Sequence, residues 1–331
     1  PKYKDQYPVI VLSKTLVSAL RNFIPLGIGV FLIFYSLSSI TSDQRLQIWL
    51  TVQQAHLLPI LISVVFGAMS HLSRAYRWKY LLNPLGYHPK LKNLIASVLV
   101  NYLSNLGIPR SGEVLRVTAI YAYEKIPFSK AAGTVISERV IDLVIMLLLV
   151  FSAIYLGGDW VKAELSESFG QLMSIYIIIV LVFAIIVFAL LINSERFPFM
   201  ARIKSFFINI YQGILSIGSV SNAYAFWAHT IFIWLMYIMM FWVIQFSLPL
   251  SATLGIDVIL LGFVAGGLSI TVTNGGIGLY PLAVATVLNH YGMSYEIALA
   301  YGWIAWSSQT IMILIFGGLS FAFLPVINRK K

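Results

Sequence analysis

The chain has 331 residues, of which 59% are hydrophobic and only 10% are charged, and its mean hydropathy is +0.87. An ordinary soluble domain carries roughly 25% charged residues, so the composition excludes a soluble globular protein and indicates an integral membrane protein. The net charge of +10 fits the Lys and Arg of cytoplasmic loops better than nucleic-acid binding, and the absence of cysteine excludes disulfides and thiolate metal sites.

Six apolar runs are predicted to be transmembrane helices. A helix needs about 20 mostly apolar residues to cross the hydrocarbon layer. The runs cover 23–40, 57–69, 140–156, 172–192, 226–246 and 297–324. The second run is short unless the helix continues past His71 and Arg74, whose polar ends would then snorkel to the interface.

Two further apolar stretches, 94–121 and 258–288, are interrupted by glycine and proline. Proline ends a helix and glycine permits an unwound backbone, so we expect a pair of half-helices in each stretch. The predicted hinge residues are Gly107, Pro109 and Gly112 in the first stretch and Gly275, Gly276 and Gly278 in the second.

The charge distribution indicates that both broken stretches fold back as re-entrant hairpins. With this topology the cytoplasmic segments hold 20 of the 22 Lys and Arg residues, and only Arg45 and Lys162 lie outside. If the first stretch crossed fully, Arg110, Arg116 and their neighbours would move to the exterior. We therefore predict an all-α polytopic membrane protein with six full spans and two re-entrant hairpins, and with both termini in the cytoplasm.

The predicted topology contains an inverted repeat within a single transmembrane domain that covers 1–331. Residues 20–157 and 171–325 each give two spans, a hairpin and a third span, and the sequences SNLGI (104–108) and TNGGI (273–277) are alike. Inverted repeats with broken helices are a recurring transporter architecture. The segment 196–218 is predicted to be an amphipathic insert in the second repeat.

Charged residues gather beside the first hairpin and suggest an anion site. Glu138 and Asp142 are four residues apart on one helix face, where like charges repel, so we expect Arg110 and Arg116 between them. A half-helix that begins near Ser111 would also direct free N–H groups at an anion. The predicted headgroup-binding residues in this region are Arg110, Glu113, Arg116, Glu138, Arg139 and Asp142. A purely structural salt-bridge network is the alternative.

Other candidate residues carry weaker signals. Arg74 and Arg77, taken singly, are interpreted as topology anchors at the end of a span. In the second hairpin Asn274 is the most plausible polar contact, with Tyr280 at the start of the return half-helix. The glycine-rich loop has no lysine and follows no strand, and the five histidines lack HExxH spacing, so no cofactor and no metal are predicted.

Four motifs resemble those of a known family: RAYRW (74–78), GIPRSGEVLRV (107–117), ISERVIDL (136–143) and NGGIGLYP (274–281). They are similar to the lysylphosphatidylglycerol synthase transmembrane-region family, the flippase-like membrane domain of the multiple peptide resistance factors. The resemblance covers nearly the whole chain. It implies a bacterial or archaeal membrane protein that moves lipid between leaflets. The positions carried over by the motif match are Arg77, Arg110, Glu113, Arg116, Glu138 and Arg139, so the resemblance adds Arg77 to the predicted headgroup-binding residues.

The sequence also departs from this family. The resistance factors continue into a soluble aminoacyl-transfer domain that this sequence lacks, so we expect no aminoacyl-lipid synthesis. Relatives often have proline before the paired glycines and an acid where this chain has Tyr280 and Pro281, so the chemistry on the outer side can differ.

The expected function is transport of an anionic or aminoacylated phospholipid, or of a lipid-linked intermediate, across a bacterial cytoplasmic membrane without an ATPase. A homo-oligomer and a separate lipid-modifying enzyme stay open as partners. The alternatives are a glycosyltransferase that uses a polyprenyl-phosphate sugar, disfavoured because the predicted exterior loops have no DxD pattern, and a scaffold subunit, which has little use for intramembrane charge.

Overall fold

The computed structural model describes residues 41–108, 111–157, 220–249 and 253–329, together with Val30, Phe31 and Phe34. Every regular element in these ranges is a helix. In chain order the elements are α2 (Ser42–Gln53), α3 (Leu57–Leu82), η1 (Asn83–Leu85), α4 (Leu91–Gly107), α5 (Ser111–Glu124), α6 (Phe128–Leu156), α9 (Ala223–Trp242), η4 (Val243–Ser247), α10 (Ile256–Val272), η5 (Asn274–Gly276), α11 (Leu279–His290) and α12 (Tyr295–Ile327).

Four of the described helical segments are long and apolar enough to cross a membrane, namely Leu57–Leu85, Phe128–Leu156, Ala223–Ser247 and Tyr295–Ile327. Each contains one of the predicted spans, which makes the chain a multi-pass membrane protein. The predicted span 172–192 and the insert 196–218 lie outside the described residues. Of the predicted span 23–40 only Val30, Phe31 and Phe34 are described, and all three are helical. The total of six spans therefore stays a prediction.

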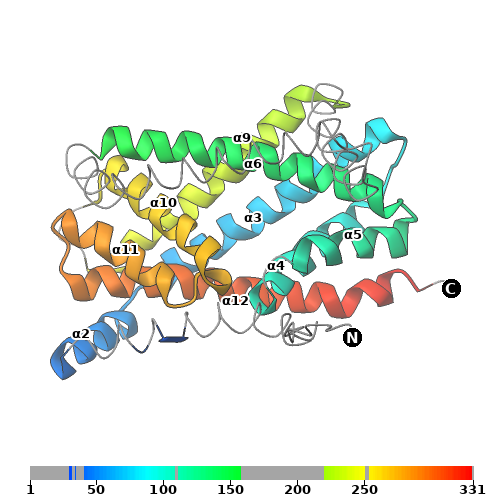
Figure 1. Cartoon of the computed structure of the whole chain (residues 1–331). Helices are drawn as coiled ribbons and strands as arrows, with labels where there is room; N and C mark the ends of the chain where they lie inside the picture. Colours follow the sequence, from blue (N-terminus) through cyan, green and yellow to red (C-terminus); the bar gives the residue numbers. More distant parts are fainter. Residues whose placement is uncertain are drawn as a thin grey trace, which may run out of the picture.

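Both interrupted stretches form pairs of helices that pack against each other, α4 with α5 and α10 with α11. The α10–α11 break contains Gly275, Gly276 and Gly278, whose φ angles of 60°, 78° and 73° lie in the left-handed region that favours glycine. Figure 1 shows the two hairpins lying at opposite ends of the molecule, between α6 and α12. Their tips meet, because a Cβ on Gly275 would lie 2.9 Å from Cδ2 of Leu106.

The packing partners of the two halves correspond. α3 packs on α9, α10 packs on α6, and α4 packs on α12, so the hairpin of each half lies on the last long helix of the other. This exchange of partners is the one expected of the predicted repeat, and the repeat itself stays a prediction. The orientation of the halves relative to the membrane stays a prediction.

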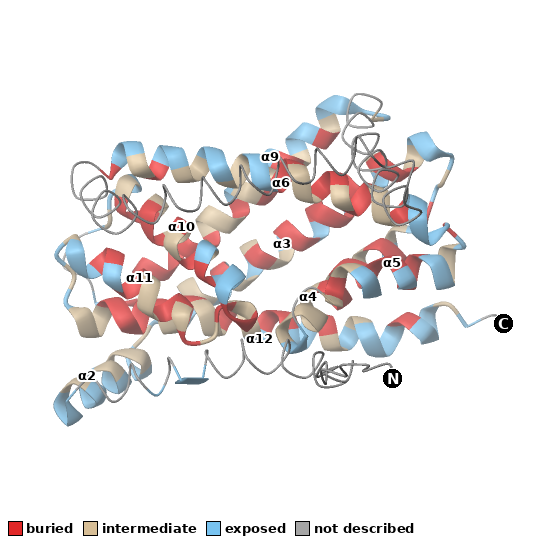
Figure 2. Cartoon of the chain, viewed as in Figure 1, coloured by how far each residue is buried: buried red, intermediate tan, exposed pale blue. Residues whose placement is uncertain are grey.

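The distribution of polar residues on α3 is that of a membrane helix. Its exposed side chains include Leu57, Leu58, Leu61 and Val65, whereas its buried face carries small, polar and charged residues. The expectation that His71 and Arg74 snorkel to the interface is wrong. Both are 2% exposed, because α3 continues to Leu82 and turns this face toward the other helices. Figure 2 shows the complementary pattern on α6, whose exposed residues run along its outer side.

The first hairpin closes through a glycine. A Cβ on Gly112 would lie only 2.0 Å from the carbonyl oxygen of Asn101, so only glycine allows α5 to approach α4 this closely. The Gly112 N–H donates to Oδ1 of Asn105 at 2.8 Å, and the Ser111 N–H donates to the carbonyl of Ile108. Two amides that we expected to be free at the start of α5 are therefore already bonded within the hairpin.

Candidate functional site

Charged side chains from three helices meet inside the protein, and we name this group the ionic cluster. Its members are Arg74 and Arg77 on α3, Glu113 and Arg116 on α5, and Glu138, Arg139 and Asp142 on α6. The cluster contains one arginine more than it has carboxylates. It therefore carries an excess positive charge at neutral pH.

Glu138 is the centre of the most deeply buried part of the cluster. Arg116 donates from Nη1 to Oε2 of Glu138 at 2.7 Å, and Nε of Arg77 lies 3.6 Å from Oε1. All three side chains are 0% exposed. The guanidinium carbon of Arg116 lies 3.7 Å from the ring centroid of Trp78, whose Nε1 donates to Oγ1 of Thr134 at 2.8 Å. The indole therefore holds the guanidinium by a cation–π contact and is itself held by a hydrogen bond.

Asp142 is paired with arginines of α3 and α6, whereas its predicted partner Arg110 lies outside the described residues. Arg77 donates from Nη1 to Oδ1 at 2.9 Å, Arg74 bonds to Oδ2, and Nη1 of Arg139 lies 3.8 Å from Oδ2. Interpreting Arg74 and Arg77 as topology anchors is wrong, because they are 2% and 0% exposed. They lie three residues apart on the buried face of α3, which packs on α6. Arg116 pairs with Glu138 as expected.

Two predicted residues of the first hairpin, Arg110 and Pro109, lie outside the described residues. The hairpin's third hinge candidate, Gly107, is the last residue of α4, and a Cβ there would meet nothing within 4 Å.

The cluster retains donors without partners. Several guanidinium nitrogens are buried and make no hydrogen bond within the described residues. They include Nη2 of Arg77, Arg116 and Arg139, and Nε of Arg74. A buried donor left unpaired costs about 1–3 kcal/mol, and more when it is charged. Together with the excess positive charge, these donors equip the cluster to bind an anion.

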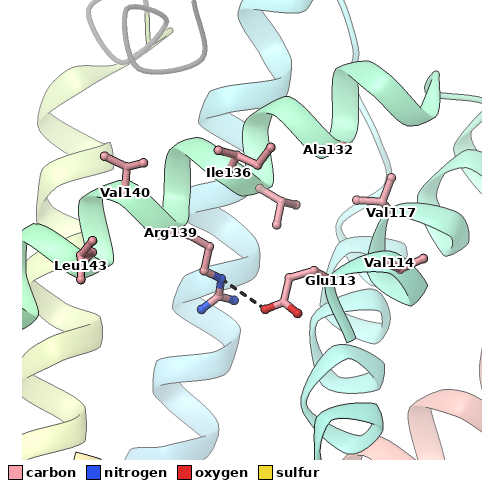
Figure 3. A pocket seen from close by; sticks show the side chains of 9 residues that line it. Glu113, Val114, Val117, Ala132, Ile136, Arg139, Val140 and Leu143 are labelled. Carbon is pink, nitrogen blue, oxygen red and sulfur yellow. Dashed lines mark ion pairs between the residues drawn. The ribbon is translucent and has the colours of Figure 1, made fainter. Parts of the chain in front are cut away.

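An apolar groove of about 310 Å³ opens beside the cluster between α5 and α6. Figure 3 shows Glu113 and Arg139 pointing toward each other at one side of it, with Nε of Arg139 3.5 Å from Oε1 of Glu113. Their side chains are 31% and 38% exposed, so this ion pair is the accessible edge of the ionic cluster. The other lining residues are apolar: Val114, Val117, Ala132, Val135, Ile136, Val140 and Leu143.

The candidates on the second hairpin are not part of the ionic cluster. Asn274 lies in η5 at the hairpin tip and is 6% exposed, and neither polar atom of its amide has a partner in the described part of the chain. Tyr280 is buried against Gly266 of α10. The carbonyl of Gly275 accepts a hydrogen bond from Nε1 of Trp306 at 2.7 Å, which fixes the tip against α12.

Sequence reasoning missed several residues that contact the cluster. Trp78 stacks on Arg116, and the Tyr237 hydroxyl accepts from Nη2 of Arg74 at 3.4 Å. Trp78 could have been found from spacing, because it is four residues after Arg74 and so shares its helix face. Tyr237 comes from a helix distant in sequence and carries no local signal.

A model of the lysylphosphatidylglycerol synthase TM region matches residues 22–317. Among curated proteins, the chain is similar to the UPF0104 membrane protein MJ1595 of Methanocaldococcus jannaschii, with 35% identity over 96 residues. That match covers 28% of this chain and 26% of the archaeal protein. No solved structure matches.

Proposed function

Because the chain belongs to the lysylphosphatidylglycerol synthase transmembrane-region family, we propose that it transports an anionic or aminoacylated phospholipid, or a lipid-linked intermediate, between the leaflets of a membrane. The observation that carries this proposal is a buried ionic cluster with spare guanidinium donors next to an apolar groove. Neither feature alone requires a lipid. Together they match a molecule with an anionic head and hydrocarbon tails.

The cluster is suited to the headgroup. Guanidinium groups bind phosphate oxygens through paired N–H donors, and the excess positive charge balances one phosphodiester. The apolar environment strengthens this attraction, because charges interact more strongly at low dielectric. Carboxylates within the cluster keep the arginines paired when no lipid is bound, which limits the energetic cost of burying them.

The groove is suited to an acyl chain. Its lining is aliphatic apart from the Glu113–Arg139 pair, and this pair lies at its polar edge. A phosphate that approaches the exposed Arg139 would leave a tail along Val117, Ile136 and Val140. The lipid would thus enter sideways from the bilayer, with its head at the cluster.

Transport requires access from both sides. We propose that the two hairpins are re-entrant, that the first opens to the cytoplasm, and that rocking of the two halves exposes the headgroup to the other side. In this arrangement both termini are cytoplasmic and the protein lies in a bacterial cytoplasmic membrane. The tip contact between Leu106 and Gly275 is where the two halves would separate.

The test uses purified protein in phosphatidylcholine vesicles that contain a trace of lipid with a fluorescent tail label. Labelled phosphatidylglycerol, lysylphosphatidylglycerol, phosphatidylethanolamine and polyprenyl phosphate are compared, and an impermeant quencher reports how much label reaches the other leaflet. We expect Arg116→Gln to abolish movement of the transported lipid. Lys79→Gln is the matched control, because it removes a cation from an exposed position on α3. Equal rates in the parent and Arg116→Gln would refute the proposal.

A further inference from the structure

A second buried polar group, around His71, lies next to the ionic cluster. Its imidazole is 2% exposed, and neither ring nitrogen has a hydrogen-bond partner within the described residues. The ring packs on Tyr102 of α4, with centroids 4.2 Å apart, and lies 6.3 Å from the ring of Tyr237 of α9. An imidazole always has at least one N–H donor, so this burial leaves a donor unused.

The hydroxyls of the same tyrosines connect His71 to the ionic cluster. Tyr102 and Tyr237 are hydrogen-bonded to each other at 3.1 Å, and Tyr237 accepts from Nη2 of Arg74 at 3.4 Å. Another donor without a partner in the described residues, Nε1 of Trp234, lies on α9 in a ring that packs edge-on against Tyr237. These groups, which come from α3, α4 and α9, form a continuous polar strip inside the protein.

The strip can be placed relative to the ionic cluster and to the hairpin tips by counting residues along α3 and α4. His71 is three residues before Arg74 on α3, about 4.5 Å along the helix axis toward its middle. Tyr102 is four residues, or about one turn, before Leu106, the residue at the contact between the hairpin tips. The strip therefore extends from Arg74 of the ionic cluster toward the middle of α3 and along α4 toward the junction at which the two halves meet.

We propose that His71, Tyr102 and Tyr237 form an inner binding site that receives the phosphodiester of the lipid when it leaves the arginines. This inference rests on the proposed lipid transport and adds a step to it. The imidazole N–H and the phenol O–H that is not used in the bond between Tyr102 and Tyr237 can donate to an anionic oxygen. Because these donors are uncharged, they bind a phosphate less tightly than guanidinium groups do, as an intermediate position on a transport path requires.

Because the His71 ring nitrogens have no hydrogen-bond partner in the described part of the protein, the imidazole can be replaced without breaking a hydrogen bond there. His71→Phe keeps an aromatic ring against Tyr102 and removes two polar atoms that bond to nothing in the described structure, so it should melt no lower than the parent. We expect it to bind phosphatidylglycerol within about twofold of the parent, since the arginines are intact, and to move the labelled lipid about tenfold more slowly or worse. His71→Gln, which keeps an N–H donor, should be faster than His71→Phe.

The control is His56→Phe, the same change at an exposed position just before α3. Movement at the parent rate in His71→Phe would overturn the inner site and leave the proposed function standing. So would equally slow movement in His71→Gln and His71→Phe with a lowered melting temperature, which would assign His71 to packing. Failure of the parent to move any lipid in the panel would instead refute the proposed function.

Discussion

Replacing Glu138 by glutamine should lower the unfolding free energy of the protein. It should also increase the stabilisation that anionic lipid gives. Glu138 accepts from Arg116 and lies beside Arg77, and all three side chains are 0% exposed. Removing one partner of a buried ion pair costs about 3–5 kcal/mol, because the remaining charge is left uncompensated. Arg116 keeps its cation–π contact with Trp78, so we expect the lower end of this range, about 3 kcal/mol.

Comparing how far anionic lipid stabilises two variants distinguishes an anion-binding site from a purely structural salt-bridge network. Glu138→Gln adds one to the excess positive charge of the ionic cluster, whereas Arg116→Gln removes it. A phosphate can take the place of the lost carboxylate in the first variant but finds a weaker site in the second. Anionic lipid should therefore restore stability to Glu138→Gln and have little effect on Arg116→Gln.

Both variants and the parent would be melted in detergent with phosphatidylcholine alone and with added phosphatidylglycerol. At a lipid concentration of about 100 times the dissociation constant, binding stabilises the folded state by about 2.7 kcal/mol, close to the expected loss in Glu138→Gln. The reasoning is refuted if phosphatidylglycerol raises the melting temperature of both variants equally. It is also refuted if Glu138→Gln melts at the temperature of the parent.

Three further changes test the surroundings of the cluster. Thr134→Val removes the acceptor of the Trp78 N–H and should lower the unfolding free energy by about 1 kcal/mol in the same melts; no change would argue against this bond. Gly112→Ala should strongly destabilise the protein, because its Cβ would lie 2.0 Å from the Asn101 carbonyl, whereas Gly107→Ala, with nothing within 4 Å, should melt like the parent. Equal melting temperatures in the two alanine variants would contradict the hairpin packing. Ala132→Trp should fill the groove and slow the movement of two-tailed lipid about tenfold while the fold is kept; an unchanged rate would exclude an acyl chain there.

Much of the architecture could be predicted because hydropathy and glycine placement are local signals. The run 226–246 predicted α9 and η4, and Ser111 was identified as the start of α5. The length of α3 was underestimated, because polar residues after Met69 read as the end of a span. In a protein that packs polar side chains inward, a charged residue within a helix does not end it.

The candidate site was predicted in its composition and only partly in its pairing. Like charges four residues apart correctly indicated that arginines lie beside Glu138 and Asp142. The pairing of Asp142 with Arg74 and Arg77 was missed because these two residues come from a helix more than 60 residues earlier in the chain, and spacing rules describe neighbours within one helix. The tyrosines near His71 were missed for the same reason.

The long separation between α3 and its carboxylates has a consequence for biosynthesis. Arg74 is translated 68 residues before Asp142, and Arg77 is translated 65 residues before it. At about 5–20 residues per second, α3 reaches the translocon several seconds before its counter-charges exist. The penalty for an unpaired arginine is about 2.5–3.5 kcal/mol at the centre of an inserting helix, and Arg74 and Arg77 lie in the last third of α3. We therefore expect this end of the nascent α3 to stay hydrated until α6 emerges, and a chain truncated before Asp142 to integrate the segment less efficiently than a longer chain.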